Sequence, residues 1–385
     1  MEILTTIKDD KPKFQFTKEE LIDMHNLKDE FLIEKWIDKL KDISFPSYYF
    51  NLTIKEAEAL YNFSDSFLKN KKINDNEIIK VIKSLEIKLQ MFIEENNLNK
   101  KGFFIKFSFR SPKDGYPLNS GKLKERFDNE VNRLSTKWDY NYMNKILNIA
   151  EEDYMGNIYW ISFIQAWKDM LRCETSQEAL NIILTSKRAQ SDLITEIEYF
   201  KMFEMTNNDK ENKESFNLNL VLREWQDGIN VDMEFRVFVK NNLINAITEY
   251  NHPFLVQELQ DKDYCNKIKT IIHSFWLNKV KSNLEYLKDY VIDFALLENG
   301  ELFFIELNPF KDSCGSGMFS WKEDHNILHG LNRDKDKTEV DNIVMKVRRD
   351  TEIPYGDYYE GCIEPEFEHI MMESYIKFGE FDKLG

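Results

Sequence analysis

Two acidic side chains interrupt otherwise apolar segments in the last third of the chain. Asp293 lies in the segment YVIDFALL, and Glu306 lies in the segment LFFIELN, which ends on Asn308. Carboxylate and amide oxygens are hard ligands, and Mg²⁺ typically takes one or two carboxylates together with phosphate oxygens of a nucleotide. If these three side chains meet, their chemistry predicts a magnesium site that operates with a bound nucleotide.

The Asn299-Gly300 dipeptide between the two segments indicates that they do meet. An Asn-Gly pair is the strongest short signal for a hairpin with a two-residue turn. In that turn the residues flanking the dipeptide stand opposite each other, and counting back puts Asp293 directly opposite Glu306. Side chains alternate along a strand, so Asn308 is expected on the same face. Directly opposed like charges destabilise a sheet, and a bound cation would remove that repulsion.

Charged side chains recur in the neighbouring predicted strands and their loops. Lysine binds phosphate as a point charge and arginine as a planar fork, so both suit an enclosed phosphate site. Any one of these residues is more often a plain surface charge, and structural ion pairs also imitate functional clusters. Their placement inside apolar strands beside the carboxylate pair favours a role in binding. The charged residues are Lys106, Arg110, Lys113, Arg223, Glu224, Glu234 and Arg236.

The hydrophobic pattern predicts a mixed α+β protein. Residues 1–100 are expected to be mainly helical, with capping boxes at Thr17–Glu20 and Thr53–Glu56. Strands are expected at 102–109, 218–225, 233–239, 243–249, 290–297 and 301–308, with helices at 122–170, 179–185 and 261–280. The tail to Gly385 is expected to mix short strands with a final helix.

Composition narrows the function classes. The formal net charge is −16, which disfavours a broad nucleic-acid-binding surface because such surfaces depend on Lys and Arg. The four cysteines form no CxxC pair and there is no HExxH motif, so neither a zinc cluster nor a metalloprotease is indicated. No apolar run reaches membrane-spanning length and the first residues are too charged for a signal peptide. A soluble, cytoplasmic protein is expected.

Several segments in the same order resemble the cell division cycle 123 family, whose members have the ATP-grasp fold. The best matches are LVLREWQDGINVDMEFRVFVKNNLINAI (220–247) and YVIDFALLENGELFFIELNPF (290–310). FFIKFSFRSPKDG (103–115) resembles the family's lysine strand and its Ser-Pro-Lys/Arg-Asp loop. Shorter matches at 45–55, 170–194 and 343–356 extend the resemblance over most of the chain.

The resemblance implies an ATP-grasp-like fold in which two α+β lobes clamp ATP with Mg²⁺. The implied units are a helical region at 1–100, an N-lobe at 101–216 with a helical insertion at about 122–170, a C-lobe at 217–330 and an extension at 331–385. It implies phosphate contact by the strand lysine, adenine contact by an Arg-x-Trp stretch and nucleotide contact by a Glu-Phe-Arg element. Those residues are Lys106, Arg223, Glu224, Trp225, Glu234 and Arg236, with Asp293, Glu306 and Asn308 as the implied magnesium ligands.

Three functions stay open at this point. The resemblance implies an assembly factor that binds the gamma subunit of eukaryotic translation initiation factor 2. The chain also departs from the family, with Glu306 in place of a usual Asp, Arg110 in place of a Ser and Tyr250 in place of a basic residue. Glu306, Arg110 and the extra segment before Met170 favour the alternative of an ATP-grasp ligase that forms an acyl phosphate, with Arg110 and Arg236 as catalytic candidates. A structural or interaction protein without a nucleotide is the third reading.

Overall fold

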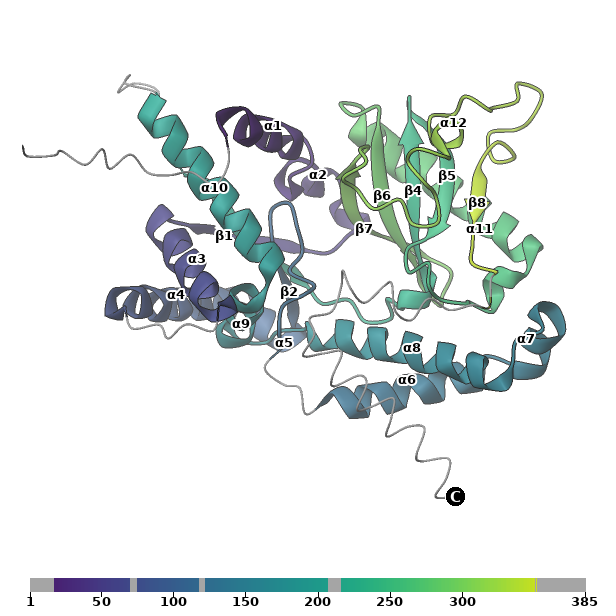
Figure 1. Ribbon diagram of the computed structural model, residues 1–385, viewed down its shortest axis with the longest axis horizontal. Coiled ribbons are helices and arrows are strands. Elements are labelled where there is room, and N and C mark those ends of the chain that lie inside the picture. Colours follow the sequence, from purple (N-terminus) through teal and green to yellow (C-terminus); the bar gives the residue numbers. More distant parts are fainter. Residues whose placement is uncertain (1–16, 70–74, 118–121, 207–215, 350, 352–385) are drawn as a thin grey trace, which may run out of the picture.

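The chain folds into two lobes that each combine one β-sheet with helices (Figure 1). The structure is a computed structural model, and it describes residues 17–69, 75–117, 122–206, 216–349 and 351. The predicted α+β class is confirmed, and the sheets of the two lobes face each other across a cleft. This is the arrangement that an ATP-grasp-like fold requires.

The N-lobe sheet has three antiparallel strands in the order β1-β3-β2. Its alternating side chains separate into two faces. Phe103 and Ile105 face a helical layer and join its apolar core, whereas Lys106 and Arg223 lie on the opposite face, which is turned to the other lobe. The strands are β1 (Ser47–Leu52), β2 (Phe103–Phe107) and β3 (Leu218–Glu224), and the helices are α3 (Ile54–Leu68), α4 (Asn76–Glu95), α5 (Leu98–Lys101), α9 (Ser176–Thr185) and α10 (Lys187–Thr206).

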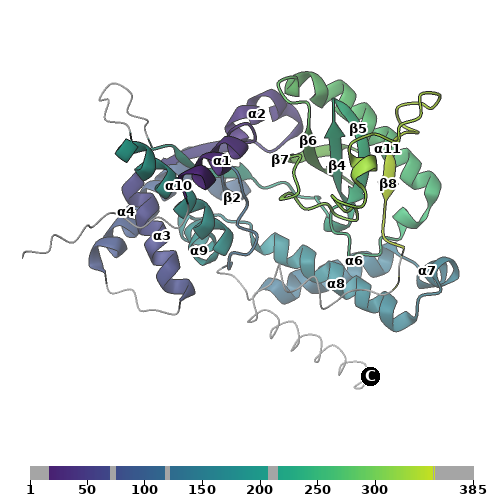
Figure 2. The same cartoon turned by 45° about the horizontal axis from the view of Figure 1, so that its top comes forward.

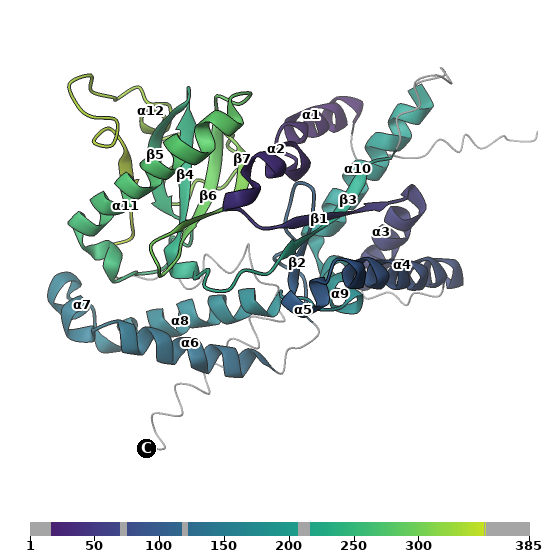
Figure 3. The same cartoon turned by 180° about the vertical axis from the view of Figure 1, so that it is seen from behind.

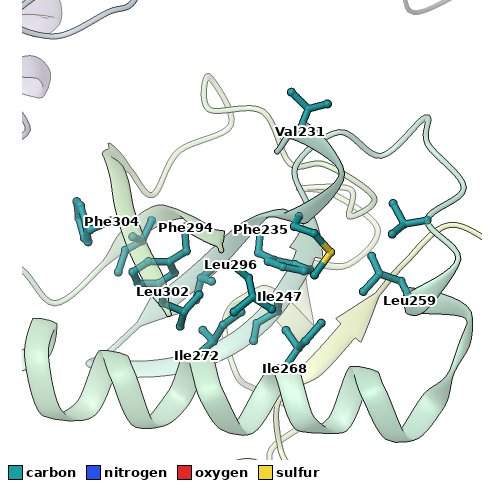
Figure 4. Close-up of a cluster of buried hydrophobic side chains, with 14 of the residues drawn as sticks. Val231, Phe235, Ile247, Leu259, Ile268, Ile272, Phe294, Leu296, Leu302 and Phe304 are labelled. Atoms are coloured by element: carbon teal, nitrogen blue, oxygen red, sulfur yellow. The ribbon is translucent and has the colours of Figure 1, made fainter. Parts of the chain in front are cut away.

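The C-lobe sheet has five strands in the order β7-β6-β4-β5-β8. Asn241 and Asn242 both have positive φ angles, of 54° and 59°, as the tight turn between β4 and β5 requires. One face of the sheet packs against α11, with Phe235 and Phe294 meeting the helix in a dense apolar layer (Figure 4). The strands are β4 (Glu234–Lys240), β5 (Leu243–Glu249), β6 (Tyr290–Leu296), β7 (Leu302–Pro309) and β8 (Val344–Lys346), and α11 (Lys262–Phe275) runs on into a π-helical turn (Trp276–Val280).

A helical insertion lies beneath the C-lobe, with one end beside the N-lobe (Figures 1 and 3). It is held mainly by the C-lobe. Arg133 donates to the buried carboxylate of Asp232 at 3.1 Å, and Lys137 pairs with Glu258 at 2.7 Å. Asn157 donates to the backbone carbonyl of Leu255 at 2.8 Å. The insertion comprises α6 (Leu123–Lys137), α7 (Tyr140–Leu147) and α8 (Glu151–Met170), and the 3₁₀ turns of the C-lobe are Val231–Met233, Glu258–Gln260 and Lys281–Leu284.

The N-terminal segment connects the two lobes. The helical segment that the capping box at Thr17 opens is interrupted, giving α1 (Lys18–Asp29), α2 (Ile33–Leu40) and a 3₁₀ turn (Lys41–Ile43). Trp36 of α2 packs on Phe304 of β7, with ring centroids 5.2 Å apart. The chain then enters β1 of the other lobe, so this segment spans the junction (Figure 2).

Some elements differ from the prediction. The strand β1 lies in the region expected to be helical, because its pairing with β3 outweighs the surrounding helical pattern. The long helix α10 was not predicted, although the capping boxes at Thr17 and Thr53 are confirmed. The polar stretch 207–215 and the expected final helix lie outside the described residues. None of the helices in the described part combines the length and apolar character needed to cross a lipid bilayer.

A short helix, α12 (His325–Leu328), lies in the loop region after β7.

Candidate functional site

The β6–β7 hairpin brings Asp293 and Glu306 opposite each other, as predicted, but by another route. The turn is closed between Leu297 and Glu301, so its loop has three residues and not two. Only Gly300 has a positive φ, at 85°, because the Asn299 side chain accepts a hydrogen bond from the Glu301 backbone instead. The predicted pairing of Glu298 with Glu301 was therefore wrong.

A bulge in β7 restores the predicted pairing further along the hairpin. Phe294 pairs with Phe304, whereas Asp293 pairs with Glu306, so Ile305 is the extra residue between them. The longer loop shifts the register by one residue and the bulge shifts it back. The two irregularities cancel before the carboxylates are reached.

Each of the two opposed carboxylates has its own buried cation. The guanidinium of Arg236, which pairs with Asp293 across β4 and β6, donates to both oxygens of that carboxylate at 2.8 and 2.9 Å. Asn308 donates to Asp293 at 3.1 Å. Lys106 reaches across from the N-lobe and donates to Glu306 at 2.7 Å. The repulsion expected between the carboxylates is thus offset by these two ion pairs.

The three predicted magnesium ligands therefore lie together at one place. Asp293 is buried and Glu306 lies at the cleft, with Asn308 bonded to Asp293. In the described residues, no group of three or more His, Cys, Asp and Glu side chains is gathered as a metal site would gather them. Two carboxylates and one amide oxygen are a sparse, hard donor set. Such a set fits Mg²⁺ that takes its remaining ligands from phosphate and water.

Arg223 ties the two lobes together beneath the cleft. It is buried, and its two terminal nitrogens donate to the Ile305 carbonyl at 2.8 Å and to the Ser44 hydroxyl at 2.9 Å. Ser44 in turn donates to the Phe304 carbonyl at 2.7 Å, and the guanidinium lies 4.2 Å from the ring centroid of Phe45. None of these partners carries a negative charge. Burial accordingly lowers the pKa of Arg223 to about 10, although nearby Glu306 opposes this shift.

The floor of the cleft carries more positive than negative charge. Burial alone would raise the pKa of Glu306, but the charges of Lys106, Lys113 and Arg223 outweigh it and lower this pKa to about 2. One carboxylate thus faces three cations. Burial also lowers the pKa of Lys106, with Glu306 opposing the change. An enclosed site with surplus positive charge favours an anionic ligand.

The cleft itself has a volume of about 340 Å³. Its walls come from both lobes and from α8 of the insertion. The lining combines aromatic and apolar side chains with charged groups. Among its lining residues are Phe45, Phe104, Lys113, Phe163, Ile164, Trp167, Lys168, Arg188, Arg223, Glu224, Trp225, Glu234, Tyr250, Asn251, Ile305 and Glu306.

Five of the eight predicted binding residues line this cleft, whereas Lys106, Arg110 and Arg236 are not among its lining residues. Lys106 is buried behind Glu306, to which it donates, and Arg110 faces another element. Its guanidinium turns to α10 and pairs with Asp192 at 2.7 Å, so it holds the loop after β2 to that helix. Arg236 lies behind the cleft wall, bonded to Asp293 and to the Gly315 carbonyl. Glu224 lines the cleft but is bonded to Lys101 and to the hydroxyl of Tyr48. The structure therefore gives no support for Arg110 as a phosphate contact or catalytic residue.

Several residues of the site have no signal in the sequence. Lys168 of α8 pairs with Glu234 at 2.5 Å, and Trp167 beside it lines the cleft. Both belong to a helix that was expected to be a peripheral insertion. Ser44 and Arg188 were missed as well, because their roles depend on contacts with residues far away in the chain.

The fold and the site define a two-lobed α+β protein with a cationic cleft and an adjoining hard-ligand set. The family model described as D123 matches residues 159–356, which is more than half of the chain. The chain belongs to the D123 family. The matched range begins within α8 and includes β3, β4 and the β6–β7 hairpin.

Three proteins similar to this chain carry the same name. This chain is 32% identical over 111 residues to the translation initiation factor eIF2 assembly protein of Candida albicans, and the match covers 29% of this chain and 31% of that protein. For the protein of the same name in Vanderwaltozyma polyspora, identity is 33% over 119 residues, or 30% of each chain. For that in Dictyostelium discoideum it is 24% over 253 residues, or 64% of this chain and 60% of the relative. These matches thus span between about a third and three fifths of the relatives.

Solved structures of Cdc123 from Schizosaccharomyces pombe are also similar. One is 14% identical with a TM-score of 0.46, covering 88% of this chain and 100% of that chain. A C-terminally truncated form is 15% identical with a TM-score of 0.47 and the same coverage.

Proposed function

We propose that this protein binds ATP together with Mg²⁺ in the cleft between its lobes. The observation that carries the proposal is the charge of the cleft floor, where Lys106, Lys113 and Arg223 converge on the single carboxylate of Glu306. A polyanion such as a triphosphate would balance the surplus. The aromatic side chains that line the same cleft, which include Trp225 and Phe163, suit a stacked base.

In this proposal the charged residues of the site have separate tasks. Lys106 and Lys113 hold the phosphates, and Arg223 keeps β7 at a fixed place beside them through the Ile305 carbonyl. Asp293, Glu306 and Asn308 would hold the magnesium ion, which neutralises phosphate charge when bound. Arg236 and Lys106 meanwhile keep the two carboxylates in position.

The replacement Glu306→Gln tests the magnesium role. In the presence of EDTA the variant should bind ATP more tightly than the natural protein, because a negative charge beside the phosphates is gone. The strengthening of ATP binding by Mg²⁺ should fall by about tenfold or more, which is the scale on which metal sites respond to a lost partner. Isothermal titration with ATP in Mg²⁺ and in EDTA measures both effects.

A matched control is Glu301→Gln, which removes the same charge from the exposed turn of the same hairpin. It should titrate like the natural chain in both buffers. An unchanged magnesium effect in Glu306→Gln would rule out this residue as a ligand.

The biological role proposed for the chain is assembly of translation initiation factor 2, through contact with its gamma subunit. The chain's membership of the D123 family supports this role, as does its similarity to proteins named translation initiation factor eIF2 assembly protein. We expect purified gamma subunit on a solid support to retain this protein, whereas the beta subunit should not. Absence of retention with and without Mg·ATP would contradict the assembly role and leave nucleotide binding untouched.

The ligase alternative is weaker on the structure than on the sequence. One of the three features that favoured it was Arg110 near the phosphates, and this side chain pairs with Asp192 outside the cleft. Another was Glu306, whose contacts with Lys106 and proximity to Asp293 are equally suited to binding without chemistry. The third, the extra segment before Met170, lines the cleft through Trp167 and Lys168, which serves nucleotide binding as well as catalysis.

A further inference from the structure

Tyr250 lies between two cations that come from different lobes. Its hydroxyl accepts a hydrogen bond from the Lys113 ammonium at 3.0 Å, and that nitrogen is 4.7 Å from the centroid of the ring. The guanidinium of Arg236 lies 4.8 Å from the same centroid. An aromatic ring attracts cations to its face, so both contacts are stabilising.

The backbone that carries Lys113 is fixed independently of Tyr250. The neighbouring Asp114 accepts hydrogen bonds from the Ser186 hydroxyl at 2.5 Å and from the Arg188 backbone at 3.2 Å. A side chain at Gly115 would come within 2.3 Å of the Ile182 carbonyl oxygen, so only glycine fits there. With the loop held this firmly, the direction of the Lys113 side chain is set by its contact across the cleft.

Tyr250 lies next to the expected magnesium ligands. The tyrosine directly follows β5, and its backbone N–H donates to the Glu234 carbonyl at 2.8 Å. Arg236, which it contacts, is the residue that holds Asp293. In nucleotide sites the metal ions bridge the outer phosphates. The Lys113 ammonium is therefore held where the outer phosphates of a nucleotide would lie.

We infer that Tyr250 is a positioning residue that aims Lys113 at the outer phosphates and so makes the cleft prefer a nucleoside triphosphate over a monophosphate. This inference rests on the proposed binding of ATP and deepens it. A tyrosine suits the task because it fixes a cation without adding a third positive charge to those of Lys113 and Arg236. It also carries no negative charge that would repel a phosphate.

Two variants separate the parts of this role. Tyr250→Phe removes the hydrogen bond and keeps the ring, whereas Tyr250→Leu removes both. We expect Mg·ATP binding to weaken about 3- to 10-fold in the first and about 10- to 50-fold in the second, from the usual strengths of a hydrogen bond to a charged group and a cation–π contact. Affinity for AMP should stay within about twofold of the natural value, because AMP has no outer phosphates.

Tyr286 provides the matched control. It is an exposed tyrosine whose ring lies 4.4 Å below the ammonium of Lys39, remote from the cleft lining. Tyr286→Phe and Tyr286→Leu should leave the affinities for both nucleotides unchanged. Isothermal titration of all five proteins with Mg·ATP and with AMP gives the ratio of the two dissociation constants.

Three results would overturn an assignment. Equal loss of ATP and AMP affinity would show that Tyr250 shapes the whole cleft and does not act on the outer phosphates. Unchanged ATP affinity in both variants would remove Tyr250 from the site. Absence of binding of either nucleotide by the natural protein would instead overturn the proposed function. Should Tyr250→Leu not fold, the Tyr250→Phe result alone decides the inference.

Discussion

Replacing Lys106 by methionine is expected to weaken Mg·ATP binding on the order of 100-fold. Loss of a buried charge partner in a binding site typically costs roughly 2–5 kcal/mol, and about 2.8 kcal/mol corresponds to this factor. Lys106 is 1% exposed and reaches Glu306 from the opposite lobe. It is therefore the side chain through which a phosphate would connect both lobes.

The fold should survive this replacement. Methionine fills a similar volume, and Glu306 keeps the nearby charges of Lys113 and Arg223. Lys80→Met is a suitable control, since Lys80 is 71% exposed and pairs only along its own helix with Glu77. Titration of both variants with Mg·ATP, alongside thermal unfolding, separates binding from stability. If Lys106→Met binds as tightly as the natural protein, the phosphates do not lie against β2.

Replacing Asp293 by alanine is expected to lower the free energy of unfolding by about 3–5 kcal/mol, the usual consequence of breaking a buried ion pair from one side. Arg236 would remain in a buried position with only the Gly315 carbonyl among its present polar partners. Urea denaturation followed by fluorescence or circular dichroism measures the change.

Two comparisons identify the cause of this loss. Asp128→Ala removes an exposed partner of Lys124 in α6, and a pair of that kind contributes at most about 1 kcal/mol. The double variant Arg236→Met with Asp293→Leu should recover most of the stability, because it leaves no unpaired charge inside the protein. A loss below about 1 kcal/mol in Asp293→Ala would contradict the buried pair.

Asp293 has two roles, and this affects how the magnesium site is tested. Asp293 is both an expected magnesium ligand and the partner of Arg236. A change in magnesium response after its removal would thus combine metal loss with local unfolding. Glu306 is the cleaner probe because it lies at the cleft and its environment keeps several cations.

The sequence was sufficient for the parts of the site that depend on local patterns. Strand periodicity and the Asn299-Gly300 turn led to the pairing of Asp293 with Glu306. The predicted pairing agrees with the structure partly because two irregularities cancel. The turn is one residue longer than predicted, and the bulge at Ile305 shifts the register back by one residue. No pattern in the sequence distinguishes these two registers, because residues 302–305 are all apolar and give no alternation that would assign them to one face of the sheet.

Other parts of the site depend on contacts between distant segments. Arg110 follows the strand that carries Lys106, yet the orientation of its side chain is set by the ion pair with Asp192 on α10, a helix that was not predicted. Arg223 was expected at the adenine and instead bonds to Ser44 and to β7. Trp167 and Lys168 belong to a helix whose neighbours could not be inferred from its own pattern. Such outcomes follow from packing between lobes, on which amphipathicity and turn signals carry no information.

Binding of ATP by the natural protein, strengthened by Mg²⁺, is the property on which the proposed site depends most directly. Isothermal titration with ATP in Mg²⁺ and again in EDTA tests this claim without any substitution. We predict one saturable site per chain whose affinity is clearly higher with Mg²⁺ than with EDTA. Absence of saturable binding in both buffers would contradict the proposed nucleotide site, and equal affinity in both would contradict the magnesium ligands Asp293, Glu306 and Asn308.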